Sequence, residues 1–184
     1  ADKIDASNTP VYEKRPINEK AVEAIIPLKN LSDFPALENI HGQNELRNLA
    51  RSTVVHHIHD KDILDYRLFT LTAPTGIGKT LTSLDFALKL KKLLRARQNQ
   101  EAQIIYGLPF INIIEQAYDV YANQVFHKEI ANDDIRILAH YQYADVFGKE
   151  KTNEQTGYHQ KLMQWDTWQS DLVITSFVQF FETL

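Results

Sequence analysis

The run Ala73-Pro74-Thr75-Gly76-Ile77-Gly78-Lys79-Thr80 constrains this chain more than any other feature of its sequence. It has the Lys-Thr ending and the spacing of a phosphate-binding P-loop, with alanine where the first glycine usually stands. Its glycines allow the backbone N–H groups to point inward at a triphosphate. We expect Lys79 to reach the β and γ phosphates and the Thr80 hydroxyl to bind Mg²⁺, which makes these two residues the catalytic candidates. The predicted nucleotide site comprises Pro74, Thr75, Gly76, Ile77, Gly78, Lys79 and Thr80.

The sequence on either side of this run fits a P-loop. Residues 67–72 alternate and are rich in strand formers, and Leu81, Leu84 and Leu88 follow at helical spacing. A P-loop requires this order of strand, loop and helix, and the positive end of the helix adds to the attraction for phosphate. The alternative is a glycine turn that merely joins a strand to a helix. The agreement of motif and context favours nucleotide binding.

The rest of the chain alternates between strand and helix patterns. Further strands are predicted over Gln103–Leu108, Ile135–Ala139 and Leu172–Thr175. Helices are predicted over Asn44–Ile58, the stretch from the P-loop to Arg97, Ile111–Tyr121 and Phe177–Leu184, and short ones over Glu19–Ile26 and Tyr158–Trp168. This alternation predicts an α/β fold with a mainly parallel sheet and helices on both faces.

Composition sets broad limits on the class of protein. The 184 residues include no cysteine, which excludes a disulfide framework and thiolate chemistry. No apolar run approaches the roughly 20 residues of a membrane span, so we expect a cytoplasmic protein with no membrane partner. The net charge of −4 does not indicate a nucleic-acid-binding protein, but it does not exclude a local basic groove that binds nucleic acid. Residues 1–40, with four prolines and no sustained period, are interpreted as a linker or the remnant of an upstream domain.

The P-loop alone leaves the reaction open, because kinases, GTPases, transport ATPases and helicases all have one. Two further segments narrow the choice. One predicted strand ends in Leu108-Pro109-Phe110-Ile111-Asn112-Ile113-Ile114-Glu115-Gln116, and another ends in Ile174-Thr175-Ser176-Phe177-Val178-Gln179-Phe180-Phe181-Glu182-Thr183-Leu184. Both lie after the carboxyl ends of parallel strands, where open α/β sheets place their ligand sites.

Together these segments resemble the first RecA-like domain of superfamily 2 helicases. More narrowly, they are similar to the CRISPR-associated helicase–nuclease that acts as the effector of type I systems. The segments that match are Asn44–Arg47, Leu71–Leu90, Tyr106–Gln116 and Trp168–Leu184, which together span residues 44–184. The P-loop is shared by many families, whereas its combination with the other segments is much more specific.

The resemblance implies roles for individual residues. The P-loop would bind ATP and Mg²⁺, with Asn44 and Arg47 in an upstream element near the nucleotide. Pro109 and Phe110 match a segment that touches the backbone of single-stranded DNA, and Thr175 and Ser176 match a second such segment. Each residue also has a plainer interpretation. In that interpretation Pro109 ends a strand, Thr175 and Ser176 cap the following helix, and Arg47 is a surface charge on a helix. None of them then contacts a ligand.

The resemblance also implies parts that the 184 residues do not contain. ATP hydrolysis needs an acid at the end of a hydrophobic strand, yet Asp134 and Asp171 each precede a predicted strand. We therefore expect residues 41–184 to be a first RecA-like domain truncated before its acidic box, and inactive alone. The parent would be an ATP-dependent single-stranded DNA translocase or helicase coupled to a nuclease. Its implied partners are a second RecA-like domain, the nuclease domain and the RNA-guided surveillance complex of a type I CRISPR system.

Other interpretations stay open. A P-loop kinase would need an arginine-rich lid, and none is apparent, while a nucleotide-dependent interaction module would need no acidic box. His56-His57-Ile58-His59-Asp60 invites a metal site, but a solvated helix end is the favoured interpretation because other spaced ligands are lacking. We assign no metal beyond the Mg²⁺ that accompanies the nucleotide.

Overall fold

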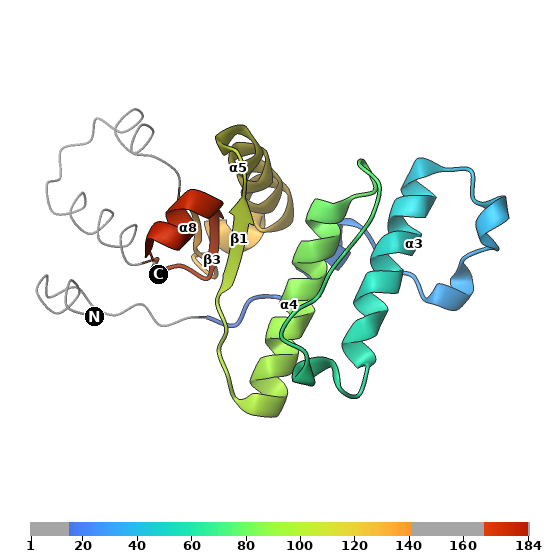
Figure 1. Ribbon diagram of the computed structural model, residues 1–184, viewed down its shortest axis with the longest axis horizontal. Coiled ribbons are helices and arrows are strands. Elements are labelled where there is room, and N and C mark those ends of the chain that lie inside the picture. Colours follow the sequence, from blue (N-terminus) through green and yellow to red (C-terminus); the bar gives the residue numbers. More distant parts are fainter. Residues whose placement is uncertain (1–14, 141–167, 184) are drawn as a thin grey trace, which may run out of the picture. The chain divides into compact units, whose positions relative to one another are not determined.

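The computed structural model describes residues 15–140 and 168–183 (Figure 1). These residues form two compact units. One comprises residues 18–102, and the other combines residues 15–17 with residues 103–140 and 168–183. The P-loop belongs to the first unit and the strands belong to the second.

The first unit is helical and is built around the helix that follows the P-loop. Helix α4 (Lys79–Gln98) begins directly after the loop and ends at Asn99, whose φ of 52° is a left-handed C-cap. Helices α2 (Ala21–Ile25) and α3 (Gln43–His56) both pack against α4. Short 3₁₀ turns occupy Leu31–Asp33 (η1), Leu37–Asn39 (η2), His57–His59 (η3) and Ile63–Asp65 (η4). The buried apolar side chains of this unit are Ala21, Val22, Ile40, Val55, Ile58, Ile63, Leu84 and Leu88.

The second unit contains a three-stranded, all-parallel sheet of order β1-β3-β2. Its strands are β1 (Ile104–Leu108), β2 (Ile137–His140) and β3 (Leu172–Ser176). Leu172 pairs with Ile104 on one side and with Ile137 on the other, so β3 is the central strand. Residues 172–175 are accordingly buried, as a run that is apolar on both faces predicts.

Helices flank this sheet, and the predicted α/β fold is confirmed. Helix α5 (Ile111–Tyr118) packs across all three strands and continues into the π-helical turns of η5 (Asp119–Val125). Helix α6 (His127–Ala131) follows, and α8 (Phe177–Thr183) packs against β1 and β3. The core of this unit lies between the sheet and the helices. There the ring of Tyr106 on β1 lies 5.6 Å from the ring of Tyr121 on η5, measured between centroids. A small, open parallel sheet flanked by helices is consistent with a RecA-like domain.

One predicted strand is absent. Residues 67–72 form no strand, and among the described residues they have no strand partner. Leu68 is 81% exposed, and Phe69 and Leu71 are also exposed. Alternation of apolar residues shows that a segment suits a sheet, but a strand exists only where a neighbour accepts its hydrogen bonds. The prediction of a strand before the P-loop is therefore wrong for this structure.

Other sequence predictions fall partly or wholly outside these findings. The predicted helix over residues 158–168 lies outside the described residues, apart from Trp168 at its end. The division of the chain near residue 40 stays a prediction. No helix in residues 15–140 or 168–183 combines the length and the apolar character that a membrane crossing requires.

Candidate functional site

The P-loop has the backbone conformation that its glycines predict. Gly76 and Gly78 have φ values of 84° and 87°, in the left-handed region that side chains other than glycine rarely adopt. A Cβ atom on either glycine would meet no neighbour closer than 3.8 Å. The requirement for glycine is therefore conformational rather than steric. Gly78 is also the N-cap of α4, so the loop leads straight into a 20-residue helix.

Lys79 and Thr80 form the first turn of that helix. The Lys79 side chain turns back over the loop, where its ammonium donates a hydrogen bond of 2.8 Å to the carbonyl oxygen of Ala73. Lys79 is exposed and Thr80 is half-buried. The exposed ammonium thus lies at the N-terminus of α4, where backbone N–H groups and the helix dipole already favour an anion.

The structure brings Asn44 and Arg47 to the loop, although they precede it by about thirty residues. The Arg47 Nε donates to the carbonyl oxygen of Gly76 at 2.7 Å. One of its terminal nitrogens donates to the Asn44 side-chain oxygen at 3.2 Å. Both residues lie on the first two turns of α3, so this helix presents a polar pair to the loop. Arg47 thus has partners within the chain, whereas its role near a nucleotide and the plainer interpretation, a surface charge on a helix, both stay predictions.

Three residues near this site were not predicted. The Gln43 side chain lies near Gly76, with its amide nitrogen 3.8 Å from the position of a Cβ on that glycine. Arg51 and Asp85 form a buried ion pair between α3 and α4. The spacing of Arg47 and Arg51, four residues apart, was the available signal, because it places both on one side of a helix.

The segments expected to contact DNA lie at neighbouring strand ends in the second unit. Leu108, the last residue of β1, is in register with Ser176, the last residue of β3. Pro109 and Phe110 follow β1 and are exposed, Phe110 by 64%. The Phe110 carbonyl accepts hydrogen bonds from Ile113 and Ile114 N–H and so begins α5. The exposed Phe110 ring is free to meet a ligand.

Thr175 and Ser176 are placed differently from each other. Thr175 is fully buried, and its hydroxyl donates to the carbonyl oxygen of His140 at 3.0 Å. Ser176 is half-buried, and its hydroxyl accepts a hydrogen bond of 3.2 Å from the Gln179 N–H. That contact is an N-cap for α8, the plainer role foreseen for this pair. Whether either residue also contacts DNA stays a prediction.

The histidine run does not assemble a metal site with its own neighbours. The His57 Nδ1 lies 2.9 Å from an Asp60 carboxylate oxygen, and the rings of His56 and His59 meet edge-on with centroids 6.0 Å apart. Across the described part of the chain, no three His, Cys, Asp or Glu side chains are grouped closely enough to hold a metal ion.

The loop has features that fit a triphosphate with Mg²⁺. Two left-handed glycines, an exposed lysine and a helix N-terminus coincide at one place. Backbone N–H groups and an ammonium are donors for phosphate oxygens, and a threonine hydroxyl is an oxygen ligand suited to Mg²⁺.

Comparison with known proteins supports the resemblance to CRISPR-associated helicases. The chain is 26% identical over 196 aligned positions to the CRISPR-associated nuclease/helicase Cas3 of Haloferax volcanii. The alignment covers the whole of this chain and 21% of that protein. The chain thus spans about a fifth of the length of the relative that it matches. No family model matches the sequence.

Proposed function

We propose that this chain is the ATP-binding part of a helicase motor related to the CRISPR-associated nuclease/helicases. The observation that carries the proposal is the P-loop itself. Its two glycines have left-handed backbones, it opens directly into α4, and Arg47 of α3 is bonded to its Gly76 carbonyl. The likeness along the full chain to a nuclease/helicase supports a helicase rather than another P-loop class.

Each residue of the site has a chemical task in this proposal. The N–H groups of the loop and of the first turn of α4 bind phosphate oxygens, and Lys79 places a positive charge on the same oxygens. The Thr80 hydroxyl binds Mg²⁺, which neutralises charge on the phosphates when it is present. Arg47, bonded to Asn44, holds the loop at the Gly76 carbonyl. Hydrolysis needs an acid that none of the described strands carries at its carboxyl end, so we expect binding without turnover.

The proposal extends to nucleic acid through the strand ends of the second unit. Pro109, Phe110, Thr175 and Ser176 lie at or after the ends of two adjacent parallel strands. An exposed phenylalanine offers a base a surface for stacking, and Ser176 offers a hydroxyl to a phosphate. In the parent protein these segments would hold single-stranded DNA while ATP drives translocation. A second RecA-like domain, a nuclease domain and an RNA-guided CRISPR complex would be its partners.

A calorimetric titration of the 184-residue chain with ATP and Mg²⁺ tests the nucleotide site. Lys79→Ala should weaken binding about 10- to 100-fold, because charge-assisted hydrogen bonds contribute about 1.5–3 kcal/mol. Lys61→Ala, which removes an exposed lysine outside the loop, is the matched control and should leave affinity unchanged. Circular dichroism should show that both variants are folded.

The titration and a phosphate-release assay separate the competing functions. Lys79-dependent binding without turnover supports a helicase part that lacks its acid. Rapid ATP turnover, or transfer of phosphate to a small molecule, would contradict that assignment and favour a complete NTPase or a kinase. Equal affinity for Lys79→Ala and the unmodified chain would show that the P-loop is not the binding site.

A further inference from the structure

Helix α3 carries two arginines that face the P-loop helix one turn apart. Arg47 donates to the Gly76 carbonyl of the loop. Arg51, four residues later, has its Nε 3.5 Å from a carboxylate oxygen of Asp85 on α4. Residues four apart lie on the same side of a helix, so the two arginines share one face of α3. Asp85 lies six residues after Lys79, about 9 Å along α4 from the loop.

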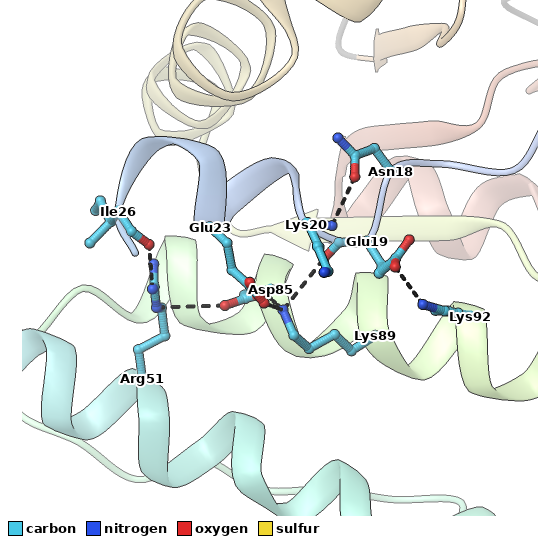
Figure 2. Close-up of polar contacts among 9 residues, drawn as sticks. All are labelled: Asn18, Glu19, Lys20, Glu23, Ile26, Arg51, Asp85, Lys89 and Lys92. Atoms are coloured by element: carbon cyan, nitrogen blue, oxygen red, sulfur yellow. Dashed lines mark hydrogen bonds and ion pairs between the residues drawn. The ribbon is translucent and has the colours of Figure 1, made fainter. Parts of the chain in front are cut away.

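The pair between Arg51 and Asp85 is buried and is covered by the segment 18–26, here called the strap (Figure 2). Arg51 is 3% exposed and Asp85 is fully buried. Figure 2 shows Arg51 reaching from α3 toward both Asp85 and the strap, where it donates to the carbonyl oxygen of Ile26 at 2.5 Å. Lys89 bonds the other Asp85 oxygen and also pairs with Glu23 of the strap at 2.7 Å. Arg51 and Lys89 thus link the Asp85 carboxylate to the strap.

Stability alone does not account for this arrangement. Removing two charges from water costs several kcal/mol per ion, and apolar side chains of similar volume often stabilise a fold equally well or better. The site is also incompletely bonded: among the described residues, Arg51 Nε, Arg51 Nη1 and Asp85 Oδ2 are buried without a hydrogen-bond partner, so Arg51 and Asp85 interact as an ion pair. Burial lowers the pKa of Arg51, whereas the charges of Asp85 and Glu23 raise it. What such a pair offers over an apolar contact is direction, because it fixes one helix against another at a defined position.

We infer that Arg51 and Asp85 are a positioning pair that fixes α3 against α4 and thereby holds Arg47 on the P-loop. Arg51 cannot shift along α4 without losing Asp85, and Arg47 is carried on the same helix one turn away. The strap contacts the pair through the Ile26 carbonyl oxygen, which accepts a hydrogen bond from Arg51. The effect of this pair on nucleotide affinity rests on the proposed function, whereas its effect on Arg47 does not.

The decisive variant replaces the pair by apolar residues, Arg51→Met with Asp85→Leu. We expect a denaturation midpoint that is unchanged or higher, since the double change removes one charge of each sign and leaves Lys89 paired with Glu23. We also expect affinity for ATP and Mg²⁺ to fall about tenfold. A purely structural pair predicts instead that affinity follows stability, so a stable double variant with unchanged affinity would overturn the inference. Should it fail to fold, Arg51→Lys serves in its place, because lysine has one charged nitrogen and lacks the second nitrogen with which Arg51 donates to Ile26. Unchanged affinity in that folded variant would likewise overturn the inference.

The same helix offers a matched control. Lys91 is also a buried cation of α4, and it pairs with Glu101 at 2.6 Å and donates to the Ala102 carbonyl at 2.5 Å. This pair joins α4 to residues 101 and 102, which follow the helix. Lys91→Met with Glu101→Leu should leave nucleotide affinity unchanged, whatever it does to stability. A tenfold loss in this control would show that any buried pair on α4 affects the loop, and would overturn a specific role for Arg51 and Asp85.

A double-mutant cycle shows whether the pair acts through Arg47. With Arg47→Ala already present, the apolar replacement should weaken binding less than twofold further, because the contact that it positions is gone. Full additivity of the two losses would overturn the inference. The Nε–H signal of Arg47 in a ¹H–¹⁵N spectrum gives a readout without nucleotide. It should be protected from exchange in the unmodified chain and lose that protection in the apolar double variant. If the chain binds no ATP, the proposed function fails and this signal alone decides the positioning role.

Discussion

Gly78 shows how one backbone conformation controls the candidate site at the residue scale. Its φ of 87° places it in the left-handed region, where an added Cβ costs about 1–2 kcal/mol. That Cβ would find ordinary space, 3.8 Å from the Arg47 side chain. Gly78→Ala should therefore lower the free energy of unfolding by about 1–2 kcal/mol. It should also weaken ATP binding, because the strained loop relaxes from the conformation in which its N–H groups bind phosphate. Urea denaturation and calorimetry measure the two effects.

Gly42 provides the control for that substitution. It is the N-cap of α3 with φ of −89°, and a Cβ there would lie 3.8 Å from the Glu45 Cβ. Alanine adopts this φ without strain but is a poorer N-cap than glycine, so Gly42→Ala should lower the free energy of unfolding by about 1 kcal/mol and leave ATP affinity unchanged. Equal losses of ATP affinity in the two variants would show that the left-handed backbone of Gly78 is not what the loop requires.

Glu19 of the strap gives a prediction for pH. The hydrogen bond from Lys92 lowers the pKa of Glu19 below its ordinary value of 4.5. A carboxyl with a depressed pKa stabilises the fold above the unfolded-state pKa and loses that contribution as pH falls through the folded-state value. Since the Lys92 side chain is 62% exposed, the ion pair contributes only about 0.2–1 kcal/mol. Glu19→Gln should be less stable than the unmodified chain at pH 7, and the difference should shrink as pH falls below 4.5 and through the lowered folded-state pKa. A difference independent of pH would contradict the ion pair, and Glu38→Gln, at an exposed glutamate, is the control.

What the sequence could predict at this scale depends on whether a residue's task is local. The P-loop glycines and lysine were identifiable because their spacing alone defines the loop. Arg47 was found through a family resemblance, since its partner Gly76 is 29 positions away. Arg51 and Asp85 were missed because charged side chains are usually solvated, and only the packing of α3 on α4 buries them.

At the scale of elements, Ser176 tests whether a strand end serves structure or ligand. Its hydroxyl caps α8 by accepting from the Gln179 N–H. Ser176→Ala should lower the free energy of unfolding by about 1 kcal/mol, and Ser176→Asn should retain stability because asparagine is an equally good cap. Denaturation of the three proteins measures this series. Equal stability of all three would mean that the cap contributes nothing.

Helices α3, α4, α5 and α8 and three of the strands were predicted from local patterns, whereas α6 was not predicted and the strand at residues 67–72 did not form. Central strand β3 is a short apolar run with partners on both sides, so its sequence and its pairing agree. The segment at residues 67–72 has equally good strand residues, but its formation depends on a partner distant in sequence. The capping of α8 by Ser176 is local and was foreseen as an alternative, whereas the burial of Thr175 follows from the pairing of three strands.

At the scale of the whole molecule, the two sets of candidate residues belong to different compact units. The P-loop, Asn44 and Arg47 lie in residues 18–102, while Phe110 and Ser176 lie in the unit that holds the sheet. A substitution at an exposed side chain disturbs little beyond its own surroundings. Equilibrium binding of nucleotide and of single-stranded DNA should therefore be separable by single substitutions, each tested without the other ligand.

Phe110→Ala and Lys79→Ala form the pair that tests this separation. Removing the 64% exposed Phe110 ring should weaken binding of a fluorescent single-stranded oligonucleotide by about 1–3 kcal/mol, the usual contribution of one base stacked on an aromatic ring, at a stated salt concentration. Its affinity for ATP and Mg²⁺ in the absence of DNA should not change. Lys79→Ala should show the reverse pattern.

If ATP strengthens DNA binding by some factor, DNA must strengthen ATP binding by the same factor, and both variants should preserve that equality even where one affinity is low. A Phe110→Ala variant with unchanged DNA affinity would remove these strand ends from the DNA path, whereas loss of both ligands in either variant would show that the two sites are not separable.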